Sequence, residues 1–239
     1  MLVFCWHNEV VPGVSVAFTD TGAGNLALHV GDDPRAVAER RDHLDRTAGL
    51  GGRSFQYMNQ VHGNAVEFIA SYGPGPTVDA MVSAATHLQG APQPLAVMVA
   101  DCVPIVFVGA DTDGQPITGV AHAGRPGVAS RIVPATVAAL RGRGALDIKA
   151  WLGPSICGSC YEVPEQLRDD VAAVVPAARS TTSWGTASLD LPAGVRSQLA
   201  ELEVPVLYSG ECTLENKDLF SYRRDPRTGR FAGLVWTHE

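Results

Sequence analysis

Two histidines and one cysteine in the middle of the chain have the residue types of a metal centre. His62 stands in NQVHG (59–63), Cys102 in ADC (100–102) and His122 in AHAG (121–124). Two imidazoles and one thiolate suit a catalytic zinc ion whose fourth position stays open. The three residues lie much further apart than the about two to five residues that separate paired ligands in zinc fingers, so the fold must assemble the site.

The neighbours of these residues favour a metal site over an ordinary structural role. A lone histidine is often exposed or simply hydrogen-bonded, and a lone cysteine on an apolar strand often packs in the core. Here, however, glycines that allow close backbone approach and polar residues that could orient ligands stand beside them: Gly63, Gly124 and Gly127, and Asn59, Gln60 and Asp101. A zinc ion with one thiolate and two neutral imidazoles stays net positive and could activate a bound water.

Strands are expected to deliver these ligands. The continuously apolar run 95–100 predicts a buried strand that ends at Asp101 and Cys102, where Pro104 should limit pairing. Residues 117–122 predict a second strand, which carries His122 at its end. A short strand at 55–58 is expected to lead into His62, and the alternation at 14–18 predicts a strand near the start of the chain.

Helices and further strands are expected around these elements. Asp32 and Asp33 followed by Pro34 predict a helix from there to about Ala48. Periodicity predicts helices over 128–140 and 165–175, a strand and turn over 149–154, a strand over 204–208, and a hairpin over 220–236 with arginines at its mouth. The pattern indicates a mixed α/β (α+β) fold in layers, with residues 1–239 as a single domain.

Composition limits the class of ligand. The chain has 239 residues, 46% hydrophobic and 18% charged residues, and a formal net charge of −7. This charge argues against broad binding to nucleic acid or to an anionic membrane, so a small ligand is expected. We found no apolar run of about 18 residues and no basic segment before the first apolar residues, and we therefore expect a cytoplasmic protein. Five scattered cysteines indicate reduced thiols rather than a disulfide framework.

Several segments resemble, in fixed order, the motifs of one family. This is the YfiH-like family, also called the polyphenol oxidase or laccase-domain family, and the segments are NLALHVGDDP (25–34), NQVHG (59–63), ADCVPI (100–105), HAG (122–124), GPSI (153–156), CYEV (160–163) and FSYRRD (220–225). The resemblance implies a single-domain, layered α/β/β/α-type sandwich. It also implies that His62, Cys102 and His122 hold a zinc ion.

The resemblance further implies an activity. The family is associated with phosphorolysis of adenosine, inosine, guanosine and methylthioadenosine to a base and a pentose 1-phosphate, and with adenosine deamination. Its members would be monomers that take a small purine nucleoside and phosphate. An older label, copper-dependent laccase, attaches to some members, but multicopper oxidation of phenols needs several coppers and more histidines than the seven present here.

Phosphorolysis requires groups that hold phosphate. Arg223 and Arg224 are candidates because guanidinium binds oxyanions in a bidentate manner, although a solvated arginine pair is an equal alternative. Arg125 could reach the same anion. By resemblance, Asn25 and His29 are expected near the pocket, whereas the competing interpretation of His29 is a buried, hydrogen-bonded imidazole.

Two departures from the family pattern leave other functions open. The loop 18–24 is shortened, with Asp20 where arginine is common, and the segment 122–127 lacks the family's tryptophan. A non-catalytic binding protein is therefore one alternative. Another is a hydrolase or editing factor that acts on a peptidoglycan precursor, with Cys102 as nucleophile and His122 as base. A deaminase signature, His-x-Glu with Cys-x-x-Cys, occurs only as distant fragments at His7 and at Cys157.

Overall fold

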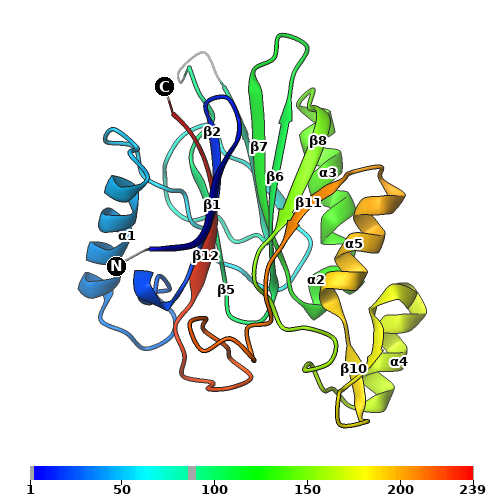
Figure 1. The fold of residues 1–239 in the computed structure, drawn as a ribbon. Helices are drawn as coiled ribbons and strands as arrows, with labels where there is room; N and C mark the ends of the chain where they lie inside the picture. The colour runs from blue at the N-terminus through cyan, green and yellow to red at the C-terminus, as the bar shows by residue number, and fades with distance from the viewer. Residues whose placement is uncertain (1–2, 86–89, 239) are drawn as a thin grey trace.

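The computed structural model describes residues 3–85 and 90–238. Most of the strands in these ranges form two sheets that pack face to face (Figure 1). The four-stranded sheet has the order β1 (Phe4–Val11), β2 (Val14–Thr19), β12 (Phe231–Thr237) and β5 (Leu95–Val99). The six-stranded sheet has the order β11 (Val206–Ser209), β8 (Leu146–Leu152), β6 (Val103–Ala110), β7 (Pro116–Ala123), β4 (Ala80–Ala84) and β3 (Val66–Phe68).

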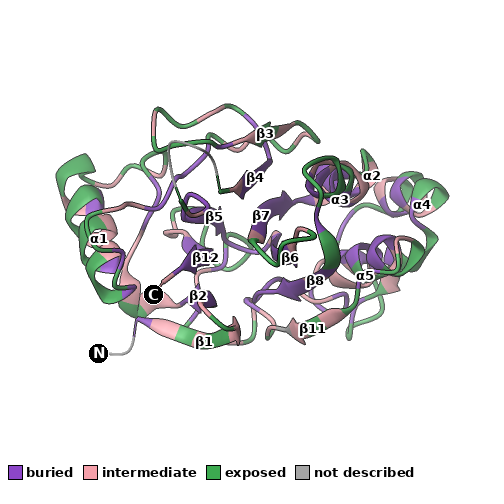
Figure 2. Ribbon diagram, turned by 90° about the horizontal axis from the view of Figure 1, so that it is seen from above, coloured by how far each residue is buried: buried purple, intermediate pink, exposed green. Residues whose placement is uncertain are grey.

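Helices cover the outer face of each sheet, so the molecule has four layers (Figure 2). Helix α1 (Pro34–Thr47) lies on the four-stranded sheet. Helices α2 (Arg125–Ala129), α3 (Ile132–Gly142), α4 (Glu165–Val174) and α5 (Leu191–Glu201) lie on the side of the six-stranded sheet. Two short 3₁₀ turns, η1 (Thr21–Ala23) and η2 (Pro176–Ala178), and a two-stranded ribbon of β9 (Arg179–Thr181) and β10 (Ala187–Leu189) complete the arrangement.

Apolar side chains fill all three interfaces between the layers. Between the two sheets the buried cluster includes Phe18, Val106 and Val235, and every residue of β5 and β12 is buried. Both faces of these strands are covered, which explains their continuously apolar sequences. No described helix has the length and apolarity needed to cross a bilayer.

Several predicted elements are present with nearly the expected bounds. Helix α1 begins after Asp33, whose side chain accepts a hydrogen bond from the Arg35 N–H, and Pro34 occupies its first turn. Strands β2, β5 and β7, and helix α4, also match the predictions. In each case the local pattern and the tertiary packing require the same structure.

Other predictions about the elements were wrong. Residues 55–58 form no strand, because only isolated bridges from Gln56 and Asn59 attach this segment to its neighbours. Pro104 lies inside β6 and does not end the pairing, because it stands opposite His122 in the ladder with β7, whereas the ladder with β8 starts at Ile105. The helix expected over 128–140 is two helices, α2 and α3, separated at Arg131, which has a left-handed φ of 66°.

The hairpin expected over 220–236 does not form. Residues 220–230 are a loop, and β12 instead pairs with β2 and β5. The Arg224 guanidinium explains the loop conformation, because it donates to the carbonyl oxygens of Thr213, Leu214 and Leu219. These bonds hold the segment against residues 213–219 and away from a partner strand.

Candidate metal centre and pocket

The ends of both sheets bring His62, Cys102 and His122 together. Cys102 lies between β5 and β6, where the chain passes from one sheet to the other, and His122 is near the end of β7. One donor atom from each of the three residues lies within 4.8 Å of the others. The Cys102 Sγ is 3.9 Å from the His62 Nε2, and the two imidazole rings are 4.6 Å apart.

The loop that carries His62 is attached to the end of β5. The Gln60 side chain donates to the Met98 carbonyl oxygen at 2.7 Å and accepts from the Met98 N–H at 2.9 Å. His62 itself has a φ of 61°, an uncommon conformation for a residue with a side chain. Such strain is typical of functional sites, and here it turns the imidazole towards Cys102.

Asp79 positions both histidines of the centre. This fully buried carboxylate lies 2.8 Å from the His122 Nδ1 and accepts from the N–H groups of His62 and Gly63 at 2.9 and 2.6 Å. Burial opposes its charge, but these hydrogen bonds outweigh burial and lower the pKa of Asp79. The carboxylate therefore leaves the His122 Nε2 available to face the cluster.

The thiol and the imidazole of the cluster shift one another's ionisation. Burial opposes ionisation of Cys102, but His122 and His62 outweigh burial and lower the pKa of Cys102 to about 6. Burial likewise opposes a charge on His122, but the Cys102 thiolate and Asp79 raise the pKa of His122 to about 9. At neutral pH the metal-free chain therefore favours a thiolate beside an imidazolium.

Gly124 is required by the close packing of the cluster. A Cβ atom on this residue would lie 2.7 Å from the His62 ring and 3.1 Å from the Cys102 Sγ. Its own φ of −74° is ordinary, so the constraint comes from space and not from backbone conformation.

A cavity of about 660 Å³ opens onto the cluster. Its walls combine the three cluster residues with cationic, aromatic and apolar side chains, which include His29, Met98, Val99, Arg125, Ile156, Tyr161, Leu191, Tyr222, Arg223 and Arg230. A mostly apolar cavity with a few convergent polar groups is the usual form of a small-molecule site.

Three arginines give this pocket its cationic character. The Arg223 side chain lies over the Tyr161 ring and donates to the Glu162 carbonyl oxygen, and Arg230 lies over the Tyr222 ring. The positive charge of Arg125 acts on the Tyr161 phenol and favours a lower pKa of that group. Burial and the nearby Cys102 raise the pKa of Tyr161, so this phenol keeps its proton at neutral pH.

The structure distributes the other sequence candidates between the pocket and the scaffold. His29, Arg125 and Arg223 line the pocket. Burial, with help from Arg230 and Arg41, lowers the pKa of His29, so this imidazole is neutral at neutral pH. Asn25 and Arg224 are outside the lining.

Asn25 and Arg224 both make structural hydrogen bonds. The Asn25 amide bonds the backbone of Ala27 and Arg230, which fixes the loop before β12. Arg224 binds the backbone carbonyl oxygens described above. Asp20, the residue that departs from the family pattern, caps the turn η1 by accepting from the Gly22 N–H.

Sequence reasoning missed Asp79, Tyr161 and Arg230. Asp79 stands directly before β4, and an aspartate directly before the apolar residues 80–82 was the signal in the sequence that could have found it. Arg230 directly precedes β12 but reaches the pocket only because the loop 220–230 folds back. Tyr161 was read only as part of a family motif.

The fragments of a deaminase signature do not meet. His7 lies on β1, whereas Cys157 and Cys160 lie with Cys212 and Glu215 in a separate cluster. His87, to which the sequence assigns no role, lies outside the described residues.

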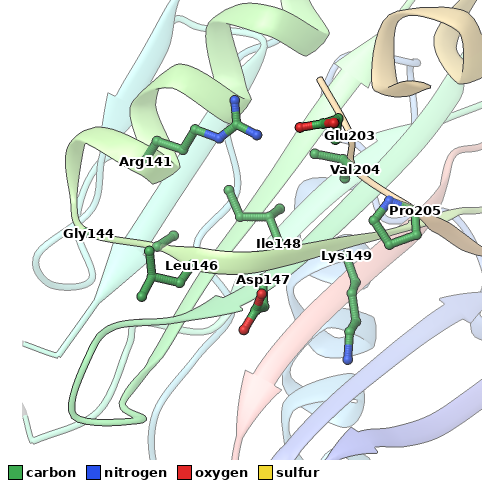
Figure 3. A pocket seen from close by; sticks show the side chains of 10 residues that line it. Arg141, Gly144, Leu146, Asp147, Ile148, Lys149, Glu203, Val204 and Pro205 are labelled. Atoms are coloured by element: carbon green, nitrogen blue, oxygen red, sulfur yellow. The ribbon is translucent and has the colours of Figure 1, made fainter. Parts of the chain in front are cut away.

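A second hollow, of about 510 Å³, lies beside β8 and lacks polar side chains that converge on one point. Figure 3 shows Arg141 and Glu203 on one side of the strand, whereas Asp147 and Lys149 extend to the other side. The cavity at the cluster is therefore the better candidate for a reaction site.

A family model described as "Multi-copper polyphenol oxidoreductase laccase" matches residues 11–238. The chain belongs to this laccase-domain family. Solved structures with this fold support the assignment. A DUF152-family protein from Neisseria meningitidis is 31% identical with a TM-score of 0.83, and the match covers 100% of this chain and 99% of that one. YfiH from Bacillus licheniformis is 25% identical with a TM-score of 0.78, covering 96% and 95%. These neighbours confirm the predicted mixed α/β class.

Curated relatives in the family carry a more specific name. A purine nucleoside phosphorylase of Streptomyces coelicolor is 45% identical, and the match covers 96% of this chain and 98% of the relative. A purine nucleoside phosphorylase of Mycobacterium bovis is 42% identical, covering 94% and 88%.

Proposed function

We propose that this laccase-domain protein is a zinc-dependent purine nucleoside phosphorylase. It would convert adenosine, inosine, guanosine or methylthioadenosine and phosphate to the free base and a pentose 1-phosphate. The single observation that carries the proposal is the pocket, in which a Cys-His-His donor set and three arginines face one cavity. The names of relatives that align over nearly the whole chain agree with it.

The donor set fits zinc. His62, Cys102 and His122 offer two nitrogens and one sulfur within 4.8 Å of one another, and a zinc ion held by them would have three protein ligands, as catalytic zinc ions commonly do. Asp79 binds the second nitrogen of His122, as carboxylates commonly do for metal-bound histidines. A zinc ion held there would supply a Lewis acid.

The arginines fit phosphate. Arg125 at the start of α2, and Arg223 and Arg230 on the loop 220–230, line the cavity, so a bound oxyanion would meet guanidinium groups from two segments of the chain. We assign Arg125 and Arg223 to phosphate binding. His29 would contact the nucleoside, because a neutral imidazole can both donate and accept hydrogen bonds.

The reaction follows from these positions. An oxygen of hydrogen phosphate forms a bond to the ribosyl C1′, the bond from C1′ to the purine nitrogen breaks, and the purine leaves with that electron pair and gains the proton that the phosphate loses. Arginines that hold the phosphate near C1′ reduce the entropic cost of the encounter and stabilise charge in the transition state. The apolar walls at Met98, Val99 and Ile156 would accept the flat base and exclude water.

An assay with adenosine in the presence and absence of phosphate tests the proposal. We expect phosphate-dependent release of adenine by the protein as purified, and loss of activity together with the zinc ion at the pocket in Cys102→Ala. Inosine formed without phosphate would report deamination at the same site. Full phosphorolysis by this variant would overturn the mechanism, and zinc bound at the pocket without any turnover would favour a binding protein.

A second candidate function has its own observation. The Cys102 thiolate beside the His122 imidazolium is also the pair that a cysteine hydrolase uses, with Cys102 as nucleophile and His122 as base. Its substrate would be a peptidoglycan precursor or a similar small metabolite. Labelling by an electrophile separates the two functions, because a metal ligand is protected in the zinc-loaded protein whereas a free nucleophile is labelled equally with and without zinc.

Copper oxidase chemistry has less support despite the description of the family model. Among the described residues, the cluster at the pocket contains two histidines, and the other candidate ligand cluster contains none. Multicopper centres use many more imidazoles. Metal analysis of protein purified without added metal would decide, because copper as the main metal would revive this function.

A further inference from the structure

A second group of metal-binding side chains lies apart from the pocket. Cys157, Cys160, Cys212 and Glu215 each offer one donor atom, and these four atoms lie within 4.8 Å of one another. None of the four lines the cavity at His62. The ligands come as two pairs with the same spacing, Cys-x-x-Cys and Cys-x-x-Glu, which matches the local spacing of structural zinc sites.

The six-stranded sheet brings the two pairs together. Strands β8 and β11 are parallel neighbours, so the segments that follow them leave the same edge of the sheet. These segments continue to pair, because the Ser155 N–H donates to the Glu211 carbonyl oxygen and the Thr213 N–H donates to the Ser155 carbonyl oxygen, both at 3.1 Å. Cys212 is thereby fixed directly beside the start of the Cys157 turn.

Each pair is held by a backbone turn. The Cys160 N–H donates to the Cys157 carbonyl oxygen, and the Asn216 N–H donates to the Cys212 carbonyl oxygen, both at 3.0 Å. In the first turn a Cβ atom on Gly158 would lie 2.6 Å from the Asp190 Cβ, so only glycine fits. The turns present both pairs to the same point.

The separation of Cys160 and Glu215 agrees with tetrahedral coordination. Zinc bonds of about 2.3 Å to sulfur and about 2.0–2.2 Å to oxygen separate neighbouring ligand atoms by roughly 3.5–3.8 Å. The Cys160 Sγ and the Glu215 Oε1 are 3.6 Å apart. The Cys157 N–H also points at the Cys212 Sγ, at 3.5 Å, as a backbone donor to a ligand sulfur does.

We propose that Cys157, Cys160, Cys212 and Glu215 bind a structural zinc ion that is distinct from the ion at the pocket. Four protein donors fill the tetrahedron, so no position remains for a substrate. This inference goes beyond the proposed reaction and does not depend on it.

The ion would lie outside the cavity and would stabilise two segments that support it. Both segments hold Asp101, the residue before Cys102, because the Ile156 N–H donates to the Asp101 carbonyl oxygen at 2.9 Å and the Thr213 hydroxyl donates to its carboxylate at 2.6 Å. Ile156 and Tyr161 also line the cavity. Loss of this ion should therefore weaken substrate binding without removing the metal at His62.

Metal counting on the full chain tests the proposal. We expect about two zinc ions per chain in the unmodified protein and one in Cys212→Ser. Cys102→Ala should also hold one, and its remaining ion identifies the second site whether or not the protein is a phosphorylase. Cys5→Ser is the matched control, because Cys5 lies on β1 and belongs to neither cluster. Its Sγ is near the Phe18 carbonyl oxygen of β2. This variant should keep both ions.

A measurement without variants covers the case in which Cys212→Ser fails to fold. Alkylation of the purified protein, read by mass spectrometry, should leave Cys157, Cys160 and Cys212 unmodified until a chelator is added. Cobalt in place of zinc should give thiolate-to-cobalt absorption that persists in Cys102→Ala. Rapid alkylation of all three cysteines before chelation would overturn the proposal, and so would a disulfide between any two of them, seen as a mass lower by two hydrogens.

Discussion

The Asp79 carboxylate holds two parts of the candidate centre at once. It binds the His122 ring and, through backbone N–H groups, the loop that carries His62. A single buried charge thus sets the orientation of one ligand and the position of another. This double role explains why the site needs an acid that offers no donor atom to the cluster itself.

Asp79→Asn should weaken metal binding without changing the fold. The amide is similar in size but carries no charge, and it can present an N–H₂ group to the donors that Asp79 accepts from. The hydrogen bonds that orient both histidines would therefore be weaker. We expect zinc affinity to fall about 10- to 100-fold, the usual effect of losing such a partner. Competition with a chelator measures it. Asp113→Asn, at an exposed turn, is the control, and equal affinity in both variants would contradict the role of Asp79.

Zinc binding at the pocket should release a proton near neutral pH. Above about pH 6 Cys102 is already a thiolate, but His122, with a pKa of about 9, must lose its proton to become a ligand. Because the folded-state pKa of His122 is raised, protonation competes with the metal below about pH 9, and zinc affinity should increase from pH 7 towards pH 9. Calorimetry in buffers of different ionisation enthalpy counts the protons. A flat affinity over that range would refute this assignment.

Arg125→Ala should raise the KM for phosphate more than that for the nucleoside. Hydrogen bonds to charged groups contribute about 1.5–3 kcal/mol, which corresponds to an increase of roughly 10- to 150-fold. Arg227→Ala is a matched control, because this side chain is 94% exposed and outside the cavity. Steady-state kinetics with each substrate varied in turn gives both values, and an equal rise for both substrates would argue against phosphate binding by Arg125.

Among single residues, sequence reasoning identified those whose residue type and sequence motif are both distinctive. His62, Cys102 and His122 were found in this way, and the chain folds them into one cluster. Arg230 could not be found, because nothing in its local sequence shows that the loop before it turns back. Its place in the pocket is a property of tertiary structure.

The first turn of helix α2 is packed against the metal-binding cluster, and Gly124→Ala tests that contact. The added methyl would meet the His62 ring at 2.7 Å, which neither the strained His62 loop nor the start of α2 can easily relieve. We expect loss of zinc at the pocket while the far-ultraviolet circular dichroism stays unchanged. Gly142→Ala, where nothing lies within 4 Å of the new atom, is the control. Normal zinc content in Gly124→Ala would show that the ring moves freely.

Elements were predictable where local signals and packing agree, as in α1 with its Asp33 cap and its proline. They were not predictable where side chains replace backbone partners. The break between α2 and α3 shows this, because the Gln198 amide, 70 residues away, donates to the Val128 carbonyl oxygen near the end of α2. The 220–230 loop shows it again through the bonds of Arg224.

For the whole molecule, metal removal should lower stability. The pocket ligands and Asp79 come from segments at the ends of both sheets, so an ion bound there ties the layers together. Free metal at about 100 times its Kd stabilises a folded protein by about 2.7 kcal/mol. Urea unfolding with and without a chelator should show a loss of that order. An unchanged midpoint would mean that the layers hold together without the ion.

Periodicity indicated a mixed α/β fold in layers, but the α/β/β/α order of the layers followed from resemblance to a family. Apolar runs indicated buried strands but could not say which sheet each one joins. Strands β5 and β6 are consecutive in the chain, yet they belong to different sheets. Only the register of their partners, many residues away, decides this.

The position of β12 has a consequence for synthesis of the chain. This strand lies between β2 and β5 and pairs with residues more than 200 positions earlier, such as Phe18 opposite Gly233. Until it is made, β2 and β5 each present an unpaired edge and an apolar face. The growing polypeptide must therefore keep a half-built sheet from associating with other nascent chains, and factors that bind such edges during translation would affect its yield more than its final stability.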